Sequence, residues 1–364
     1  MKNGMKKKVL ILVNHDLVIY NFRRELVERL VSDGYEVYLS CPQGMRIPEL
    51  IEMGCKYIEA EIERHGKNIK TEISLLKYYK KIMKEIKPDV VLSYTIKPNL
   101  YGGMAAARLG IPYIANITGL GSAAGNRSFL QKAIILAYKY AFRKIKCVFV
   151  QNENIRNTFA AYKIVPDKLK LIPGSGVNLK HFTVLPYPKD TNEFYFISRI
   201  MKEKGIDQFL EAAEHYKNEN IGFHVCGFCE EEYEDKLKEL NERGVITYHG
   251  MVKDVRDALN NASATIHPTY YFEGISNVLL ESCACGRPVI TTNQNGCIEV
   301  VDEGKNGFIV NMKDTKSLIA AIDKFLKLPD SEREKMGLYG RQKVEKEFDR
   351  QIVVEKYMEQ IKNL

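Results

Sequence analysis

The sequence predicts an α/β protein made of two doubly wound, Rossmann-like domains that face one another across a cleft. The chain has 364 residues, enough for two hydrophobic cores at about 150 residues per domain. Short, β-branched apolar runs alternate with amphipathic helical patterns along its whole length, which is typical of βα units and parallel sheets. The least patterned stretch is 178–194, where Pro186 and Pro188 interrupt regular structure.

The expected elements follow this alternation in chain order. Strands are expected in the first half at 8–13, 36–41, 89–94, 112–117 and 147–152, and in the second half at 193–199, 222–227, 245–250, 264–269, 287–292 and 307–312. Helices are expected at 20–32, 71–86, 128–145, 204–217, 230–243 and 314–327. We therefore predict an N-terminal domain at 1–185 and a C-terminal domain at 186–345. The last helix, at 346–364, is expected to pack back toward the N-terminal domain.

Composition indicates the cellular setting. Only residues 9–13 are apolar before the first polar run, which is too short for a secretory hydrophobic region of about 7–15 residues. No window approaches the roughly 20 apolar residues of a membrane span. The eight cysteines are scattered among strands and helices, so we expect reduced thiols. These features favour a cytoplasmic protein.

Charge divides unevenly between the halves. Residues 1–185 carry a net charge of +15 and residues 186–364 a net charge of −7, giving the overall +8. The segments 71–88 and 128–146 place Lys and Arg beside apolar, Tyr-bearing helix faces, as interfacial helices do. We expect peripheral attachment to an anionic membrane surface; the alternative is that these faces pack on the domain's sheet. The basic residues follow no nucleic-acid-binding motif, so nucleic acid is not an expected partner.

Two helix starts in the second half carry the candidate chemistry. Arg199 ends a predicted strand and Lys204 precedes a helix, and two cations beside a helix N-terminus suit a diphosphate. The second helix start lies between Glu273 and Glu281, which are eight residues apart. If Glu273 lies in the loop and Glu281 in the helix, the N–H groups of the first turn point between them. This arrangement suits an anion with a hydroxylated group on either side.

These residues resemble the retaining glycosyltransferases of family 4, which have the GT-B fold. The segments YTIKPNLYG (94–102) and NITGLGS (116–122) further resemble the capsular polysaccharide and lipid-linked oligosaccharide branch of that family. The resemblance implies transfer of a hexose or N-acetylhexosamine from a UDP-sugar, with retention, to a polyprenyl-diphosphate-linked saccharide. It implies that the domain at 1–185 binds the acceptor and that the domain at 186–345 binds the nucleotide sugar. It places the protein at the cytoplasmic face of a membrane, in surface polysaccharide or glycan assembly.

The resemblance also implies roles for individual residues. Arg199 and Lys204 would hold the diphosphate, Glu281 the ribose hydroxyls and Glu273 the transferred sugar, so that Glu273, Arg199 and Lys204 form the catalytic set. The backbone at Gly274, Ile275, Ser276 and Asn277 would assist donor binding.

The chain departs from the family pattern at two positions. Many members carry Pro where Ser276 stands, a mild change because Ser can cap a helix. Many carry a donor-contacting His where Thr118 stands, so Thr118 or the backbone around Gly119 is the candidate replacement.

Other motifs bear on acceptor, redox and metal chemistry. His15 and Asp16 follow the first strand and are candidates to orient an acceptor hydroxyl, although a structural role is the alternative. The same turn lacks the G-x-G-x-x-G of a dinucleotide-binding domain. The C-G-F-C motif at 226–229 imitates a redox site, but we expect it to line the base pocket. Since the chain has no D-x-D pair, no metal or other cofactor is expected beyond the nucleotide sugar as co-substrate.

Two alternative functions remain open. One is a sugar-nucleotide epimerase or hydrolase with the GT-B fold, and the other is a non-catalytic nucleotide-sugar-binding subunit of a polysaccharide machine. Product analysis with and without acceptor separates the first from a transferase, and UDP titration combined with an activity assay separates the second.

Overall fold

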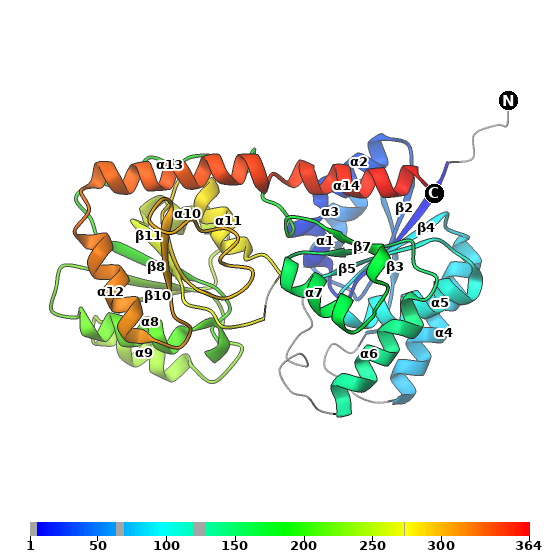
Figure 1. Cartoon of the computed structure of the whole chain (residues 1–364), viewed down its shortest axis with the longest axis horizontal. Helices are drawn as coiled ribbons and strands as arrows, with labels where there is room; N and C mark the ends of the chain where they lie inside the picture. Colours follow the sequence, from blue (N-terminus) through cyan, green and yellow to red (C-terminus); the bar gives the residue numbers. More distant parts are fainter. Residues whose placement is uncertain (1–5, 63–68, 119–128, 273) are drawn as a thin grey trace. The chain divides into compact units, whose positions relative to one another are not determined.

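The computed structural model describes residues 6–62, 69–118, 129–272 and 274–364. The chain divides into two compact units, unit 1 (Met1–Ser175 with Arg350–Leu364) and unit 2 (Gly176–Asp349). In each unit helices flank a parallel sheet, as Figure 1 shows. The predicted pair of doubly wound α/β domains is therefore confirmed.

Unit 1 contains a seven-stranded sheet in the order β3-β2-β1-β4-β5-β6-β7. Its strands are β1 (Lys8–Leu12), β2 (Glu36–Cys41), β3 (Cys55–Glu59), β4 (Val90–Tyr94), β5 (Tyr113–Ile117), β6 (Cys147–Val150) and β7 (Leu169–Leu171). Its helices are α1 (Asp16–Phe22), α2 (Arg24–Ser32), α3 (Ile47–Glu52), α4 (Ile69–Ile86), α5 (Gly103–Leu109), α6 (Phe129–Phe142), α7 (Glu153–Ala161) and α14 (Arg350–Lys362). The strand order reverses between β1 and β4, which is the switch point where ligands of doubly wound sheets bind.

Unit 2 contains a six-stranded sheet in the order β10-β9-β8-β11-β12-β13. Its strands are β8 (Glu193–Ile197), β9 (Gly222–Cys226), β10 (Thr247–Gly250), β11 (Ala264–His267), β12 (Val289–Thr292) and β13 (Gly307–Val310). Its helices are α8 (Ile206–His215), α9 (Glu234–Glu242), α10 (Val255–Asn261), α11 (Asn277–Ala284), α12 (Thr315–Leu326) and α13 (Asp330–Glu347). The order reverses between β8 and β11, so the loops after these two strands flank the switch point.

Both faces of each sheet are buried, which explains the unbroken apolar runs in the sequence. In β1, Val9 and Ile11 pack in the core shared with α2 and α14, while Leu10 and Leu12 pack in the core shared with α4 to α6. Figure 1 shows these helices on the two sides of the sheet. Every strand expected from the sequence is present. The strands missed are β3, in which Lys56 and Glu59 are exposed, and β7, which has three residues.

The helix predicted at 20–32 is two helices, α1 and α2, separated at Arg23. Arg23 has φ −139° and ψ 12°, so its backbone is not helical, and the residue is buried, with 3% of its surface exposed. Its guanidinium lies 5.3 Å from the ring centroid of Tyr94 and 5.8 Å from that of Tyr357. The break at Arg23 could not be predicted from helical periodicity, because it accompanies contacts with residues far away in the chain.

The structure corrects the predicted domain boundaries. The chain passes from unit 1 to unit 2 at Ser175/Gly176 rather than at 185/186. It returns to unit 1 at Asp349/Arg350 rather than at 345/346. Helix α14 belongs to unit 1, where Val353 and Tyr357 pack in the core and Arg350 lies 3.1 Å from Glu25.

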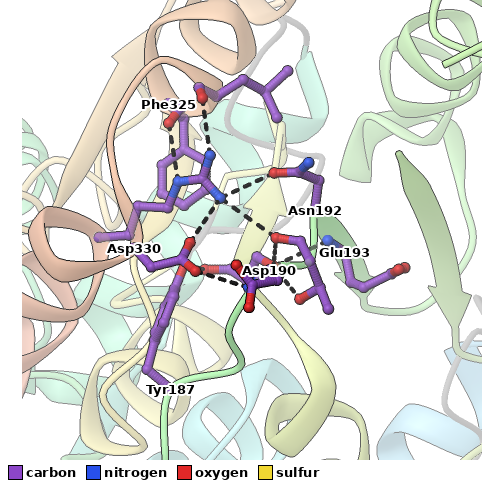
Figure 2. Close-up of polar contacts among 10 residues, drawn as sticks. Tyr187, Asp190, Asn192, Glu193, Phe325 and Asp330 are labelled. Atoms are coloured by element: carbon purple, nitrogen blue, oxygen red, sulfur yellow. Dashed lines mark hydrogen bonds and ion pairs between the residues drawn. The ribbon is translucent and has the colours of Figure 1, made fainter. Parts of the chain in front are cut away.

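Two buried arginines attach the proline-containing segment 178–194 to the rest of unit 2. Arg287 is fully buried and donates to the carbonyl oxygens of Leu185 at 3.1 Å and Pro186 at 2.6 Å. Arg333 donates to the side chain of Asn192 at 3.0 Å, and the Asp190 N–H donates to Asp330 at 2.8 Å (Figure 2). The backbone of this segment pairs with side chains rather than with a strand, so the least patterned stretch of the sequence is an ordered part of unit 2 and not the domain boundary.

Replacing Arg287 by Met should destabilise unit 2 by about 3 kcal/mol or more, because buried carbonyl oxygens lose their donor at about 1–3 kcal/mol each. The free energy of unfolding from urea titration measures this change. Arg243→Met is the control, since that side chain is 45% exposed and its ion pairs contribute little. Equal unfolding midpoints for the two variants would show that the buried guanidinium does not hold the segment.

Among the described residues, no helix combines the length and the apolar character needed to cross a bilayer.

Candidate donor site in the C-terminal unit

The loops that follow β8, β9, β11 and β12 meet at one edge of the unit 2 sheet. All these strands are parallel, so their carboxyl ends share that edge. The Tyr270 N–H, after β11, donates to the Glu203 carbonyl oxygen, after β8, at 2.9 Å. The Ile200 N–H, after β8, donates to the Phe228 carbonyl oxygen, after β9, at 2.8 Å. The edge is therefore a connected set of loops.

Gly205 allows another close approach between these loops. Its φ is +79°, and a Cβ at this position would lie 2.1 Å from the carbonyl oxygen of Pro268. Any other residue would meet both a strained backbone conformation and a clash. This glycine brings the start of α8, with Lys204 just before it, against the loop that leads to α11.

The structure brings the two predicted cations together at one aromatic ring. The Arg199 guanidinium lies 5.5 Å and the Lys204 Nζ 5.0 Å from the ring centroid of Tyr271. Lys204 is 7% exposed, and the Arg199 side chain is 31% exposed. Arg199 also forms an ion pair with Glu230, a residue that the sequence had not indicated. Two converging cations suit the two charged groups of a diphosphate.

The start of α11 differs from expectation at Ser276. Ser276 is the N-cap residue, with φ −70° and ψ 113°, but its hydroxyl makes no capping hydrogen bond, so the expected side-chain cap is wrong. Its N–H donates to the Gly296 carbonyl oxygen at 2.9 Å. The Ser276 amide, predicted to assist donor binding, therefore connects α11 to the loop after β12.

The remaining donor candidates lie on or just before α11. Asn277 and Glu281 are four positions apart and half-buried, so they share one side of the helix. Gly274 and Ile275 are buried. Glu273 lies outside the described residues, so its predicted role and its spacing from Glu281 stay predictions.

Two residues after β12 were missed by the sequence reasoning. Gln294 Nε2 donates to the carbonyl oxygens of Tyr270 and Tyr271, at 3.0 Å each, and so holds the loop that carries the shared ring. Glu299 accepts the Gly296 N–H at 2.6 Å, and burial raises the pKa of its carboxyl. The turn N-Q-N-G directly after a strand was the feature of the sequence that could have indicated them. Both residues bond to the backbone of loops, and which loops lie beside them depends on the fold.

The C-G-F-C motif is structural in the described residues. Burial raises the pKa of Cys226 to about 11 and raises that of Cys229 as well, so neither thiol is a reactive thiolate. All eight cysteines are free, as expected for reduced thiols. No group of three or more His, Cys, Asp or Glu side chains within the described ranges is arranged to hold a metal ion.

The candidates of unit 1 follow the carboxyl ends of β1 and β5. His15 caps α1: its Nδ1 accepts the Leu17 N–H at 3.2 Å and lies 2.7 Å from Asp16 Oδ1, and its side chain is 44% exposed. Asp16 is 1% exposed and accepts the Arg46 N–H at 2.7 Å, which supports the structural alternative for this residue. Thr118 is exposed directly after β5, and Gly119 lies outside the described residues.

Comparison with known families assigns both halves of the chain. The model for glycosyl transferase 4-like proteins matches residues 8–152, and the model for glycosyl transferases group 1 matches residues 178–343. The first range lies in unit 1 and the second in unit 2.

Two relatives are similar along most of their length. The N,N'-diacetylbacillosaminyl-diphospho-undecaprenol alpha-1,3-N-acetylgalactosaminyltransferase of Campylobacter jejuni is 26% identical over 361 residues, which covers 93% of this chain and 94% of the relative. The UDP-Gal:alpha-D-GlcNAc-diphosphoundecaprenol alpha-1,3-galactosyltransferase of Escherichia coli is 24% identical, with 81% of each chain covered.

Solved structures share the fold of both units. A glycosyltransferase from Rickettsia africae superposes with a TM-score of 0.82 at 19% identity and 99% coverage of each chain. HepE of Anabaena in complex with UDP superposes with a TM-score of 0.78 at 16% identity, covering 99% of this chain and 100% of that one. The two family models and the shared fold lead to one assignment: this chain belongs to the family 4 and group 1 glycosyltransferases of the GT-B fold.

Proposed function

We propose that this glycosyltransferase moves a hexose or N-acetylhexosamine from a UDP-sugar to a polyprenyl-diphosphate-linked saccharide, with retention, in capsule or other surface glycan assembly. The observation that carries the proposal is the convergence of Arg199 and Lys204 at Tyr271, beside the start of α11. The names of the two relatives support it, because both act on diphospho-undecaprenol acceptors and one uses UDP-Gal.

The proposed mechanism depends on electrostatics at the leaving group. Arg199 and Lys204 would neutralise the diphosphate as the bond from the anomeric carbon to the phosphate oxygen breaks. The acceptor hydroxyl oxygen attacks the same face of the sugar, and its proton passes to the leaving phosphate, so no separate base is required. Glu281 would accept hydrogen bonds from the ribose hydroxyls and Glu273 from the transferred sugar.

The test is a panel of nucleotide sugars scored first by thermal shift, because a true donor stabilises the protein by mass action. The donor that shifts the melting temperature is then incubated with and without an undecaprenyl-diphosphate-linked N-acetylhexosamine. A glycoside that keeps the anomeric configuration of the donor, and that forms only when acceptor is present, supports the proposal. Turnover that ignores acceptor would favour the epimerase or hydrolase, and UDP binding without turnover would favour a non-catalytic subunit.

Activity should be independent of divalent metal. Two cations and a helix N-terminus can neutralise a diphosphate, and the sequence has no D-x-D pair. We expect the transfer rate to be unchanged in EDTA. Complete loss of transfer that Mg²⁺ or Mn²⁺ restores would contradict the expectation.

We also propose that unit 1 attaches to the cytoplasmic face of an anionic membrane. Part of each basic helix packs in the core, as Tyr79 and Tyr138 do. Helix α6 nevertheless exposes Leu136 at 65% and Tyr140 at 44% of their surface. The exposed cations Lys132, Lys139 and Arg143 lie beside them, and the chain contains no acidic residue between Asp89 and Glu153. An apolar strip flanked by cations is typical of an interfacial helix.

The protein should float with vesicles that contain phosphatidylglycerol and remain unbound with phosphatidylcholine alone, because each cation near an anionic surface contributes about 1 kcal/mol. The double substitution Leu136→Ser and Tyr140→Ser should reduce the floated fraction severalfold. Leu338→Ser, at a 42% exposed position of α13, is the matched control. Equal failure to float with both vesicle types would count against membrane attachment through unit 1.

A further inference from the structure

The ion pair between Arg199 and Glu230 is a part of the donor site that the proposed mechanism does not use. Arg199 follows β8, and Glu230 lies in the loop between β9 and α9, where its carboxylate accepts a hydrogen bond from Arg199 Nη1. The two side chains are 31% and 32% exposed, so water and ligands reach the pair. A carboxylate of the protein itself therefore holds one of the two cations assigned to the diphosphate.

The backbone of the loop after β9 fixes Glu230 at this position. The Glu230 N–H donates to the Ile200 carbonyl oxygen at 3.0 Å, and the Ile200 N–H donates to the Phe228 carbonyl oxygen at 2.8 Å. Gly227 begins this loop with φ +153°, and a Cβ there would lie 1.8 Å from a carbonyl oxygen of the loop after β8. Because the two loops are joined at this point, the fold itself places the carboxylate beside Arg199.

The ring of Tyr271 keeps Arg199 in the donor site independently of Glu230. The ring centroid lies 5.5 Å from the Arg199 guanidinium and 5.0 Å from Lys204 Nζ, and cations within about 6 Å of an aromatic ring are attracted to it. The Tyr271 carbonyl oxygen accepts a hydrogen bond from Gln294 Nε2 at 3.0 Å, so the residue that carries the ring is itself held in place. Arg199 therefore does not need Glu230 in order to remain beside Lys204.

Glu230 and a diphosphate require the same atoms of Arg199. A guanidinium binds phosphate best through two nitrogens that donate to two oxygens. The hydrogen bond to Glu230 engages Nη1, so the two terminal nitrogens cannot both turn to a phosphate while the ion pair persists. A diphosphate carries more than one negative charge against the single charge of the carboxylate, and Lys204 would bind it as well, so it is the stronger partner. The carboxylate and the diphosphate therefore compete.

We propose that Glu230 sets the affinity for the donor by competing with its diphosphate for Arg199. The carboxylate holds the guanidinium before the donor binds, releases it to the diphosphate, and takes it back as the nucleotide diphosphate leaves. Donor and product therefore bind less tightly than Arg199 and Lys204 alone would allow, which favours release of the product after each transfer. The proposal rests on the proposed transfer reaction and makes Glu230 a positioning residue that acts through Arg199.

The test is calorimetric titration of the full chain with inorganic diphosphate and, separately, with UDP. Glu230→Gln should bind both ligands about two- to fivefold more tightly, the range expected when one partly exposed ion pair no longer competes. Glu230→Ala removes the acceptor altogether, so its gain should be at least as large. A gain of affinity is a readout that a damaged fold cannot produce. Glu232→Gln, at an exposed position of the same loop, is the matched control for the loss of one negative charge and should bind as wild type.

Wild-type or weaker affinity for both ligands in the two Glu230 variants would overturn the proposal, because the carboxylate would then orient Arg199 or have no effect on it. An equal gain in Glu232→Gln would also overturn it, since the effect would then come from the net charge of the loop. If the Glu230 variants bind inorganic diphosphate more tightly but no form of the chain binds UDP, the proposed UDP donor fails and the competition stands. If the wild type binds UDP and transfers sugar while no variant gains affinity, the proposed reaction stands and the competition fails.

Discussion

Lys204→Met should lower the turnover of sugar transfer by about 100- to 1000-fold, the loss usual when one preorganised group is removed from a developing negative charge. Lys204 is 7% exposed and lies at the ring of Tyr271 with Arg199, so water cannot easily replace its charge there. The loss should appear mainly in kcat, because charge on the leaving diphosphate is greatest in the transition state.

Lys202→Met is the matched control for this prediction. Lys202 belongs to the same short turn but is exposed, and its N–H donates to Glu231 at 2.7 Å through the backbone, which the substitution keeps. Steady-state kinetics and calorimetry with UDP on both variants make the comparison. Wild-type turnover in Lys204→Met, or an equal loss in Lys202→Met, would remove Lys204 from the catalytic set.

Glu281→Gln and Glu273→Gln should have different effects. Glu281→Gln keeps the shape of a half-buried helical side chain but removes a charged acceptor, so UDP affinity should fall by about 1.5–3 kcal/mol. Glu273→Gln should leave UDP affinity nearly unchanged and lower kcat, because its carboxylate would face a sugar that becomes positive only in the transition state.

Calorimetry with UDP and a transfer assay, applied to both variants, separate these effects. Glu239→Gln, at a 66% exposed side chain of α9, controls for the general loss of one negative charge from unit 2. Wild-type affinity and turnover in both Glu273 and Glu281 variants would mean that the spacing of these acids carries no chemistry.

The sequence by itself determined the fold class and the order of the site residues along the chain. Strands buried on both faces appear in the sequence as apolar runs. In a parallel sheet the residues after each run lie at one edge, which is why the sequence predicts that Arg199, Lys204 and Glu281 lie near one another. The short strand β7 and the partly polar strand β3 gave weaker signals and were missed.

Only the tertiary structure decided which side chains meet. Three contacts join loops far apart in the chain: both cations with the ring of Tyr271, Gly205 with Pro268, and Gln294 with the loop that carries the ring. The unit boundary depends likewise on Arg287, whose partners at Leu185 and Pro186 lie about a hundred residues away. Periodicity records only which face of an element is buried, whereas these contacts depend on how the crossover connections place one loop against another.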